Sequence, residues 1–143
     1  MALHPRGQSF TLDLTRFAER TKLSLTLIAR KITLEVFVKV VLRTPVDTGR
    51  ARGNWLPSFG AGRDGFDWEK KSPDGQETIA AITALVSKMK AGHVAYLCNS
   101  LPYIEALEFG HSQQALHGMA RLSVREVAGQ YNALGLGILR QTR

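Results

Sequence analysis

The chain has 143 residues, the length of a single domain, and a domain of this size buries roughly 68–70% of its unfolded surface. A hydrophobic core can therefore stabilise it without a structural metal. The one cysteine, Cys98, excludes an intramolecular disulfide and suits a small buried side chain. The start of the sequence lacks the apolar run of a signal peptide, and no window has the ~18 apolar residues of a membrane span. We therefore expect a protein of a cytosol-like compartment with no membrane contact.

The net charge is +7, and all of it lies in residues 1–63, where eleven Lys and Arg accompany four acidic residues. Residues 64–143 hold eight charges of each sign and are neutral overall. This asymmetry favours a polyanionic neighbour such as nucleic acid, or an acidic protein face. A solvated basic surface with no partner is an equally simple interpretation.

Apolar residues recur at spacings of three and four across residues 11–43, which predicts one long helix. Asp13 suits the start of its dipole, and Pro45 ends it. Residues 32–42 also alternate with the period of a strand. The length of the segment, and the absence of Gly and Pro from Gln8 to Thr44, favour the helix.

A second apolar stripe on this helix predicts a contact with a neighbouring chain. A helix over residues 11–43 would be roughly 45 Å long, whereas a compact domain of this size has a radius of gyration near ~14.5 Å. The helix must therefore kink or extend beyond its own domain, and an extended helix with two apolar faces needs a partner. The side chains predicted for this interface are Leu27, Leu34, Phe37 and Val41.

The rest of the chain predicts a small α+β body over residues 44–131, followed by a Leu- and Gly-rich tail over 132–143, all within one domain, 1–143. The expected elements are a strand or two near Ala51–Phe59, a loop over 60–75, a helix over Glu77–Lys90, a short buried strand in His93–Asn99, a helix over Pro102–Phe109 ended by Gly110, and a helix over Gly118–Tyr131 with Leu122, Val124, Val127 and Tyr131 inward.

The residue types of a catalytic centre are not arranged as one. The four histidines (His4, His93, His111 and His117) have no partners at metal-ligand spacing. Ser112 follows His111 directly, and adjacent side chains rarely point at one another. Glu105 and Glu108 lie three apart on one helix face, where surface or interface charges are the simpler interpretation. We therefore expect no catalytic residues, no metal and no cofactor.

Two segments are rich in turn residues, single aromatics and isolated charges, which suits contacts with other proteins. They are Thr44–Trp55 (TPVDTGRARGNW) and Asn99–Met119 (NSLPYIEALEFGHSQQALHGM). In this order and spacing, the two blocks resemble the neck and tail-completion family of long-tailed double-stranded-DNA bacteriophages. The resemblance covers roughly Thr11 to Val127, although residues 66–72 have no counterpart, and Leu116-His117 stand where relatives often carry Pro.

The family pattern falls on named positions of both blocks. Asp47 could accept backbone N–H groups in an Asx turn, and Gly49 suits a positive φ or a close backbone approach. Tyr103 and Leu107, four apart, would share one helix face. For the charged and polar positions, contacts between subunits and a purely fold-shaping role both stay open. The motif positions are Pro45, Asp47, Gly49, Arg50, Arg52 and Trp55 in the first block and Asn99, Tyr103, Leu107, Glu108, Gly110, Gln113, Gly118 and Met119 in the second.

The resemblance implies a non-enzymatic virion protein, assembled in the host cytoplasm, that forms a ring of six copies at the junction of head and tail. Its partners would be a second copy of the chain, a head-closure or connector protein, and a tail terminator or tail tube protein. DNA would pass through the lumen and touch basic residues without sequence readout. The alternative is a basic nucleic-acid-binding regulator that uses the N-terminal helix, although no helix-turn-helix is recognisable.

Overall fold

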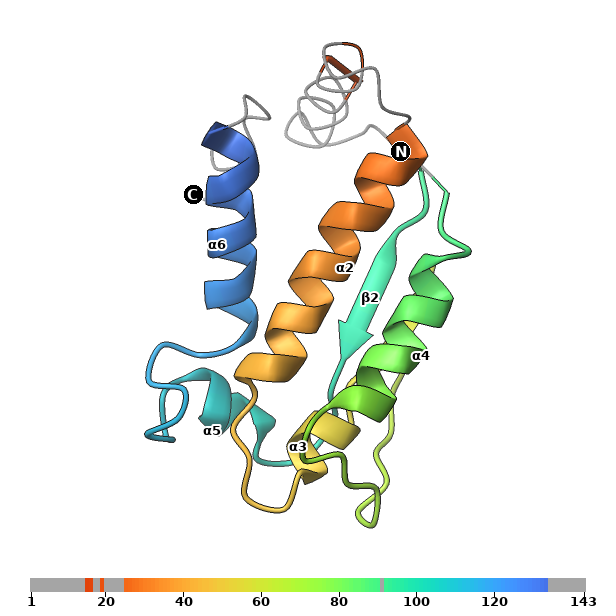
Figure 1. Ribbon diagram of the computed structural model, residues 1–143. Helices are drawn as coiled ribbons and strands as arrows, with labels where there is room; N and C mark the ends of the chain where they lie inside the picture. The colour runs from red at the N-terminus through yellow and green to blue at the C-terminus, as the bar shows by residue number, and fades with distance from the viewer. Residues whose placement is uncertain (1–14, 17–18, 20–24, 91, 134–143) are drawn as a thin grey trace.

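The computed structural model describes residues 15–16, 19, 25–90 and 92–133. Within them the chain forms an α+β fold in which five helices accompany one two-stranded sheet (Figure 1). This confirms the predicted fold class. The elements in chain order are α2 (Leu25–Arg43), α3 (Arg50–Gly53), β1 (Leu56–Phe59), α4 (Gln76–Val86), β2 (Ala95–Cys98), α5 (Ile104–Glu108) and α6 (Ala120–Ala133).

The long helix α2 is the centre of the fold, because α4 packs along one side of it and α6 along the other (Figure 1). The strands β1 and β2 pair antiparallel, with Leu56 opposite Cys98 and Phe59 opposite Ala95. The main core lies where α2, α4 and the two sequence blocks meet, and a smaller cluster lies between α2 and α6. The main core holds Val40, Val41, Trp55, Ile82, Val86, Ala115 and Met119, and the smaller cluster holds Ile28, Val127 and Tyr131.

The described part of the long helix confirms the three-and-four spacing over the competing strand pattern. The helix ends at Arg43, two residues before Pro45. Of the predicted residues 11–24, only Thr15, Arg16 and Glu19 are described, and they are helical. Residues 134–143 of the predicted tail also lie outside the described residues, whereas 132–133 belong to α6.

Ion pairs hold α6 against α2 at the surface. Lys39 and Arg43, one helical turn apart on α2, both pair with Glu126 of α6. Hydrogen bonds from Lys39 and Arg43 lower the pKa of Glu126 to about 2. Tyr131 donates a hydrogen bond to Glu35 deeper in the same interface, at 3.3 Å. Burial, together with the Glu35 carboxylate, raises the pKa of this tyrosine to about 12.

Several predicted boundaries were wrong. Residues 50–53 form the single helical turn α3, so the strand predicted from Ala51 begins only at Leu56. The helix α4 ends at Val86, not Lys90, because the chain tightens there into bonds between residues three apart, such as Met89 N–H to the Val86 oxygen. The strand β2 is half-buried, with Tyr96 exposed, because a two-stranded sheet covered on one face leaves the other open.

Two predicted side-chain positions were also wrong. Val124 faces outward because it lies on the side of α6 that points away from α2. Val127 and Tyr131 lie on the opposite side and are buried as expected. Val41 is fully buried in the subunit's own core, so it cannot line a contact between chains. Leu34 and Phe37 are half-buried and pack against that core. Leu27 alone among the four predicted interface residues is largely exposed, at 54%.

Candidate interaction site where the two sequence blocks meet

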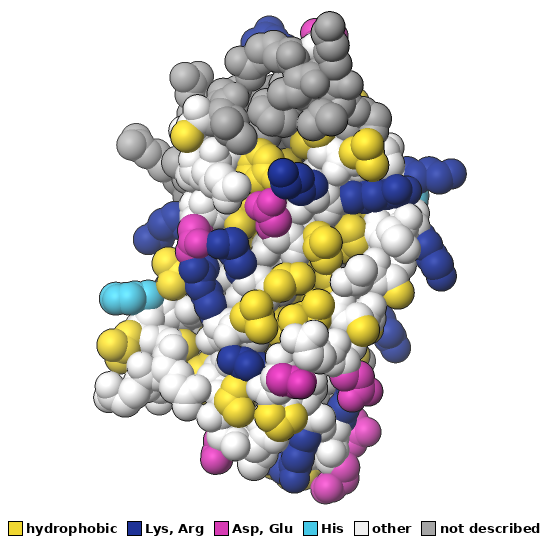
Figure 2. Space-filling view, in the orientation of Figure 1, with side chains coloured by type: hydrophobic (Ala, Val, Ile, Leu, Met, Phe, Trp, Pro, Cys, Tyr) yellow, Lys and Arg dark blue, Asp and Glu magenta, His cyan; other side chains and the backbone are white. Residues whose placement is uncertain are grey.

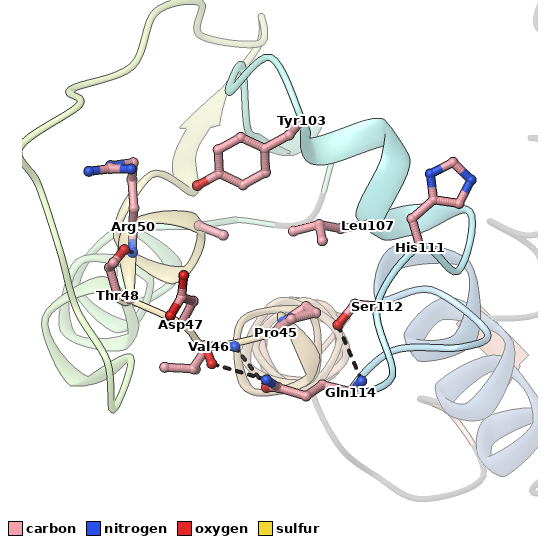
Figure 3. Close-up of a pocket in the computed structure, with 12 residues that line it drawn as sticks. Pro45, Val46, Asp47, Thr48, Arg50, Tyr103, Leu107, His111, Ser112 and Gln114 are labelled. Atoms are coloured by element: carbon pink, nitrogen blue, oxygen red, sulfur yellow. Dashed lines mark hydrogen bonds between the residues drawn. The ribbon is translucent and has the colours of Figure 1, made fainter.

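The two sequence blocks form opposite walls of one cavity of about 390 Å³ (Figure 3). The first block contributes the chain between α2 and α3, and the second contributes α5 and the loop after it. Figure 3 shows Tyr103 and Leu107 on one side, with Asp47 and Pro45 across from them. The lining residues are Pro45, Val46, Asp47, Thr48, Gly49, Arg50, Ala51, Tyr103, Leu107, His111, Ser112 and Gln114.

Gly49 permits the sharp turn between α2 and α3. Its φ is +87°, and a Cβ atom at this position would lie 2.5 Å from the backbone nitrogen of Pro73. Its carbonyl oxygen accepts the N–H of Ser72 at 2.9 Å, which fixes the end of the 60–75 loop against the first block. The sequence prediction for Gly49 is confirmed, since only glycine combines this φ with this approach.

Arg52 stabilises the same turn from within the subunit. Its guanidinium donates to three backbone oxygens, those of Thr44 at 2.9 Å, Pro73 at 2.9 Å and Leu42 at 2.7 Å. Burial lowers the pKa of this guanidinium, and Asp74 partly offsets the effect. With all three nitrogens occupied, Arg52 has the fold-shaping role, one of the two alternatives that the sequence left open.

Two further motif residues are interior. Trp55 is buried, and its Nε1–H donates to Thr44 Oγ1 at 2.9 Å, while that hydroxyl donates to the Val40 oxygen at 2.7 Å. This chain of bonds satisfies the end of α2 inside the core. Asn99 links the two blocks directly, because its Nδ2 donates to the Ala51 oxygen at 2.9 Å. Thr44 is the first residue of the first sequence block, but no role inside the core was predicted for it.

Gln114 makes the second link between the blocks. Its amide accepts the Val46 N–H at 2.8 Å and donates to the Val46 oxygen at 3.0 Å, as a paired strand would (Figure 3). The sequence favoured Gln113 instead, and both glutamines are exposed. Adjacent glutamines give no signal of which one reaches the other block, because the choice depends on the backbone direction of the loop.

Glu108 stabilises the first turn of α6. Its carboxylate accepts the backbone N–H groups of Met119 and Ala120 at 2.9 Å and of Arg121 at 3.0 Å. Arg121 adds a side-chain contact at 3.1 Å. Burial raises the pKa of Glu108, but the hydrogen bonds from Arg121, Met119 and Ala120 outweigh burial, and the net shift is downward. Of the two roles that the sequence left open for Glu108, the structure therefore favours the fold-shaping one.

The two glycines of the second block allow this arrangement. A Cβ atom on Gly110 would lie 2.6 Å from the Leu116 oxygen, and one on Gly118 would lie 2.5 Å from the Glu108 oxygen. Both residues have positive φ, at +89° and +85°. Met119 is fully buried in the main core. These motif positions shape the fold rather than meet a partner.

The cavity itself offers a mixed lining. Tyr103 and Leu107 lie on its wall as predicted, one turn apart. The Asx turn predicted at Asp47 is replaced by Thr48, whose Oγ1 accepts the Arg50 N–H at 3.3 Å. Ser112 Oγ accepts the Gln114 N–H at 3.2 Å, while the His111 ring is turned outward (Figure 3). Within the described part of the chain, Asp47 has no ion pair.

Three aromatic rings lie beside the cavity. The centroids of Phe66 and Trp68 are 5.8 Å apart, and those of Trp68 and Tyr103 are 6.3 Å apart in an edge-on arrangement. The Arg50 guanidinium lies 4.4 Å from the centre of the Trp68 ring, and its Nε donates to the Trp68 oxygen at 2.6 Å. The sequence predicted only a loop for the segment that carries Phe66 and Trp68.

Among the described residues, no three His, Cys, Asp or Glu side chains come together as a metal site would require. The same residues include no helix that is both long and apolar enough to cross a membrane. No protein-family model, curated protein or solved structure matches this chain.

Proposed function

We propose that this protein is a structural component of a bacteriophage virion that forms a ring at the head–tail junction, with six copies as the resemblance implies. In this proposal it completes the tail or joins it to the head connector, and DNA passes through the lumen. It acts without catalysis or a cofactor. Its partners are further copies of itself, a head-closure or connector protein, and a tail terminator or tail tube protein.

The observation that carries this proposal is the union of the two blocks on which the resemblance rests. They lie about fifty residues apart in the sequence, yet Asn99 and Gln114 bind the first block directly. Their glycines lie where close backbone contacts exclude a Cβ atom. A pattern that defines a family through its fold should behave in this way, with its positions shaping the turns and joining the two blocks.

An open apolar face on α2 supports assembly into an oligomer. Leu27 is 54% exposed and Leu42 is 46% exposed, and Val38 lies between them on the same side of the helix. Figure 2 shows apolar side chains gathered along α2 in the band between α6 and α4. With Val41 buried, Leu27 and Leu42 mark the face we assign to the neighbouring subunit. A stable contact there should bury at least ~800 Å² on each subunit.

A cluster of basic residues, formed by Arg30 on α2 and by Lys88 and Lys90 after α4, supports contact with DNA. Arg30 Nε donates to the Met89 oxygen at 2.6 Å, which brings α2 next to the exposed Lys88 and Lys90 after α4. Positive charge of this kind binds the phosphate backbone without reading bases. We assign this cluster to non-specific contact with DNA in the lumen.

The test combines particle assembly with solution mass. Analytical ultracentrifugation and negative-stain microscopy of the purified protein should reveal closed rings, alone or after addition of tails. Leu27→Asp should weaken assembly, whereas Val94→Asp should not, because Val94 is equally exposed but lies outside α2. In a phage that lacks the gene, heads and tails should stay unjoined. Supplying the gene in trans should restore joined particles. Infectious, fully joined particles without the protein would refute the proposal.

A further inference from the structure

Phe66, Trp68 and Tyr103 form an aromatic cluster, in which Phe66 and Trp68 are exposed and Tyr103 is half-buried. Phe66 is 46% exposed and Trp68 is 45% exposed. Arg50 stacks on Trp68, so the group combines Trp, Tyr and Arg, the residues that dominate binding energy in protein interfaces. Large rings with few rotatable bonds also lose little entropy when a partner covers them.

The loop that presents these rings is held in place before any partner arrives. Asn54 is buried, and its Nδ2 lies within hydrogen-bond distance of the Arg50, Asp67 and Lys70 oxygens at 2.9, 3.0 and 3.3 Å. Its Oδ1 accepts the Asp67 N–H at 2.8 Å. A buried amide devoted to an exposed loop indicates a preorganised surface, which lowers the entropy lost on binding.

The cluster is continuous with the cavity between the two blocks. Tyr103 belongs to both, and Arg50, which lines the cavity, stacks on Trp68. Inside the cavity, Pro45, Leu107 and the Tyr103 ring offer apolar surface, and the Asp47 carboxylate lies across from Tyr103 and Leu107 (Figure 3). The nearest guanidinium, that of Arg50, is already committed to Trp68. Among the described residues no cation pairs with Asp47.

We propose that the aromatic cluster and the adjoining cavity form a docking site for an extended segment of another protein chain that carries a Lys or Arg next to an aliphatic residue or proline. The basic side chain enters the cavity, with its stem against Tyr103 and Leu107 and its head at Asp47. The aliphatic residue or proline packs on the exposed faces of Trp68 and Phe66.

The chemistry of the cavity selects this occupant. A long basic side chain buries its apolar stem while keeping its charged head at an acceptor, which matches a wall of Leu107 and Tyr103 facing a carboxylate. An acidic side chain would face the Asp47 charge. The volume of about 390 Å³ suits one or two side chains rather than a folded domain. Arg50 covers one face of Trp68, but Phe66 and Trp68 remain 46% and 45% exposed and offer ring surface of the kind on which proline and aliphatic side chains pack.

The experiment uses the purified full chain as bait for a display library of random short peptides. We expect enriched peptides to share a basic residue beside an aliphatic residue or proline. Binding of the selected peptides, measured by fluorescence anisotropy, should weaken about 10-fold or more in Asp47→Asn, because a hydrogen bond to a charged group is lost. Trp68→Ala should weaken it by a similar factor. Both side chains are exposed, so thermal melting should show that the variants stay folded.

Matched controls separate this site from general stickiness. Asp64→Asn removes an exposed carboxylate from the same loop but outside the cavity, and Val124→Ser removes an exposed apolar side chain from α6; both should bind like the wild type. No enrichment, an acidic consensus, or equal binding by the Asp47 and Trp68 variants would overturn the inference. This site stands on the geometry of one subunit, and ring formation is measured separately by microscopy, so either proposal can fail alone. Peptides that match a surface segment of this chain would identify a second copy as the occupant.

Discussion

Replacing Glu108 by Gln should destabilise the junction between α5 and α6. The carboxylate accepts three backbone N–H groups at the start of α6, from Met119, Ala120 and Arg121, and its side chain is only 17% exposed. A glutamine retains the size and one oxygen, but it turns an NH₂ group towards donors. All of these hydrogen bonds lose the charge of their acceptor, and the bonds to one of the two carboxylate oxygens lose the acceptor itself, so at least one helix-terminal N–H is left without a partner.

We expect Glu108→Gln to lower the free energy of unfolding by about 2 kcal/mol, within the range for hydrogen bonds to charged groups and for helix N-terminal caps. For a domain of this size, that corresponds to a fall in Tm of about 7 °C. Circular dichroism at pH 7 measures it. Glu105→Gln is the matched control, because Glu105 is an exposed glutamate on the same short helix, and it should melt like the wild type.

The same interaction predicts a pH dependence with a defined sign. The pKa of Glu108 in the folded state lies below its ordinary value of 4.5. As pH falls, the unfolded chain therefore binds the proton first, so the stabilisation is complete above about 4.5 and is lost as pH drops through the lowered pKa. The difference in Tm between wild type and Glu108→Gln should shrink over that window. A difference that is absent at pH 7, or constant down to pH 3, would refute the capping role.

Three further predictions concern the turn, the assembly face and the basic cluster. Gly49→Val should lower the free energy of unfolding by about 1–3 kcal/mol through backbone strain, and an unchanged Tm would contradict this. Leu27→Asp should dissociate the oligomer in sedimentation yet leave the subunit folded, whereas Val41→Asp should unfold it; equal effects would count against the assigned face. Wild-type protein should bind two unrelated DNA duplexes alike, with a Kd near ~10⁻⁴–10⁻⁶ M. In the double variant Lys88→Glu and Lys90→Glu, the number of phosphates neutralised, obtained from the salt dependence of binding in fluorescence anisotropy, should fall by about two. Nanomolar binding of one duplex alone would favour the regulatory alternative.

The elements that the sequence predicted well are those fixed by local rules. The three-and-four spacing of apolar residues decided the helix over 25–43, because a strand would have placed Val40 and Val41 on opposite faces, whereas both are buried in one core. Gly49, predicted for a turn, and Gly110, predicted to end a helix, both have positive φ, so local turn chemistry identified them. Periodicity and glycine act within a few residues, and a sequence displays both.

The polar motif residues were predicted less well, because their roles depend on segments far along the chain. Arg52 is a surface-type residue in the sequence, yet it binds oxygens on α2 and at Pro73. Glu108 reaches a helix start more than ten residues away. Neither the length of a side chain nor its charge indicates which backbone groups the fold will bring within its reach. Such residues satisfy buried backbone groups as readily as they meet a partner.

The first sequence block holds the loop over 60–75 in place. Gly49 accepts the Ser72 N–H, and Arg50 binds the Trp68 oxygen. Asn54, which belongs to the same block, fixes the remaining backbone of the loop. The block thus forms a frame beneath the loop, while the side chains of Phe66 and Trp68 stay exposed on it. Substitutions of these two rings should therefore change the binding of a partner without disturbing the fold, which is why partner specificity should be sought at Phe66 and Trp68 rather than in the frame.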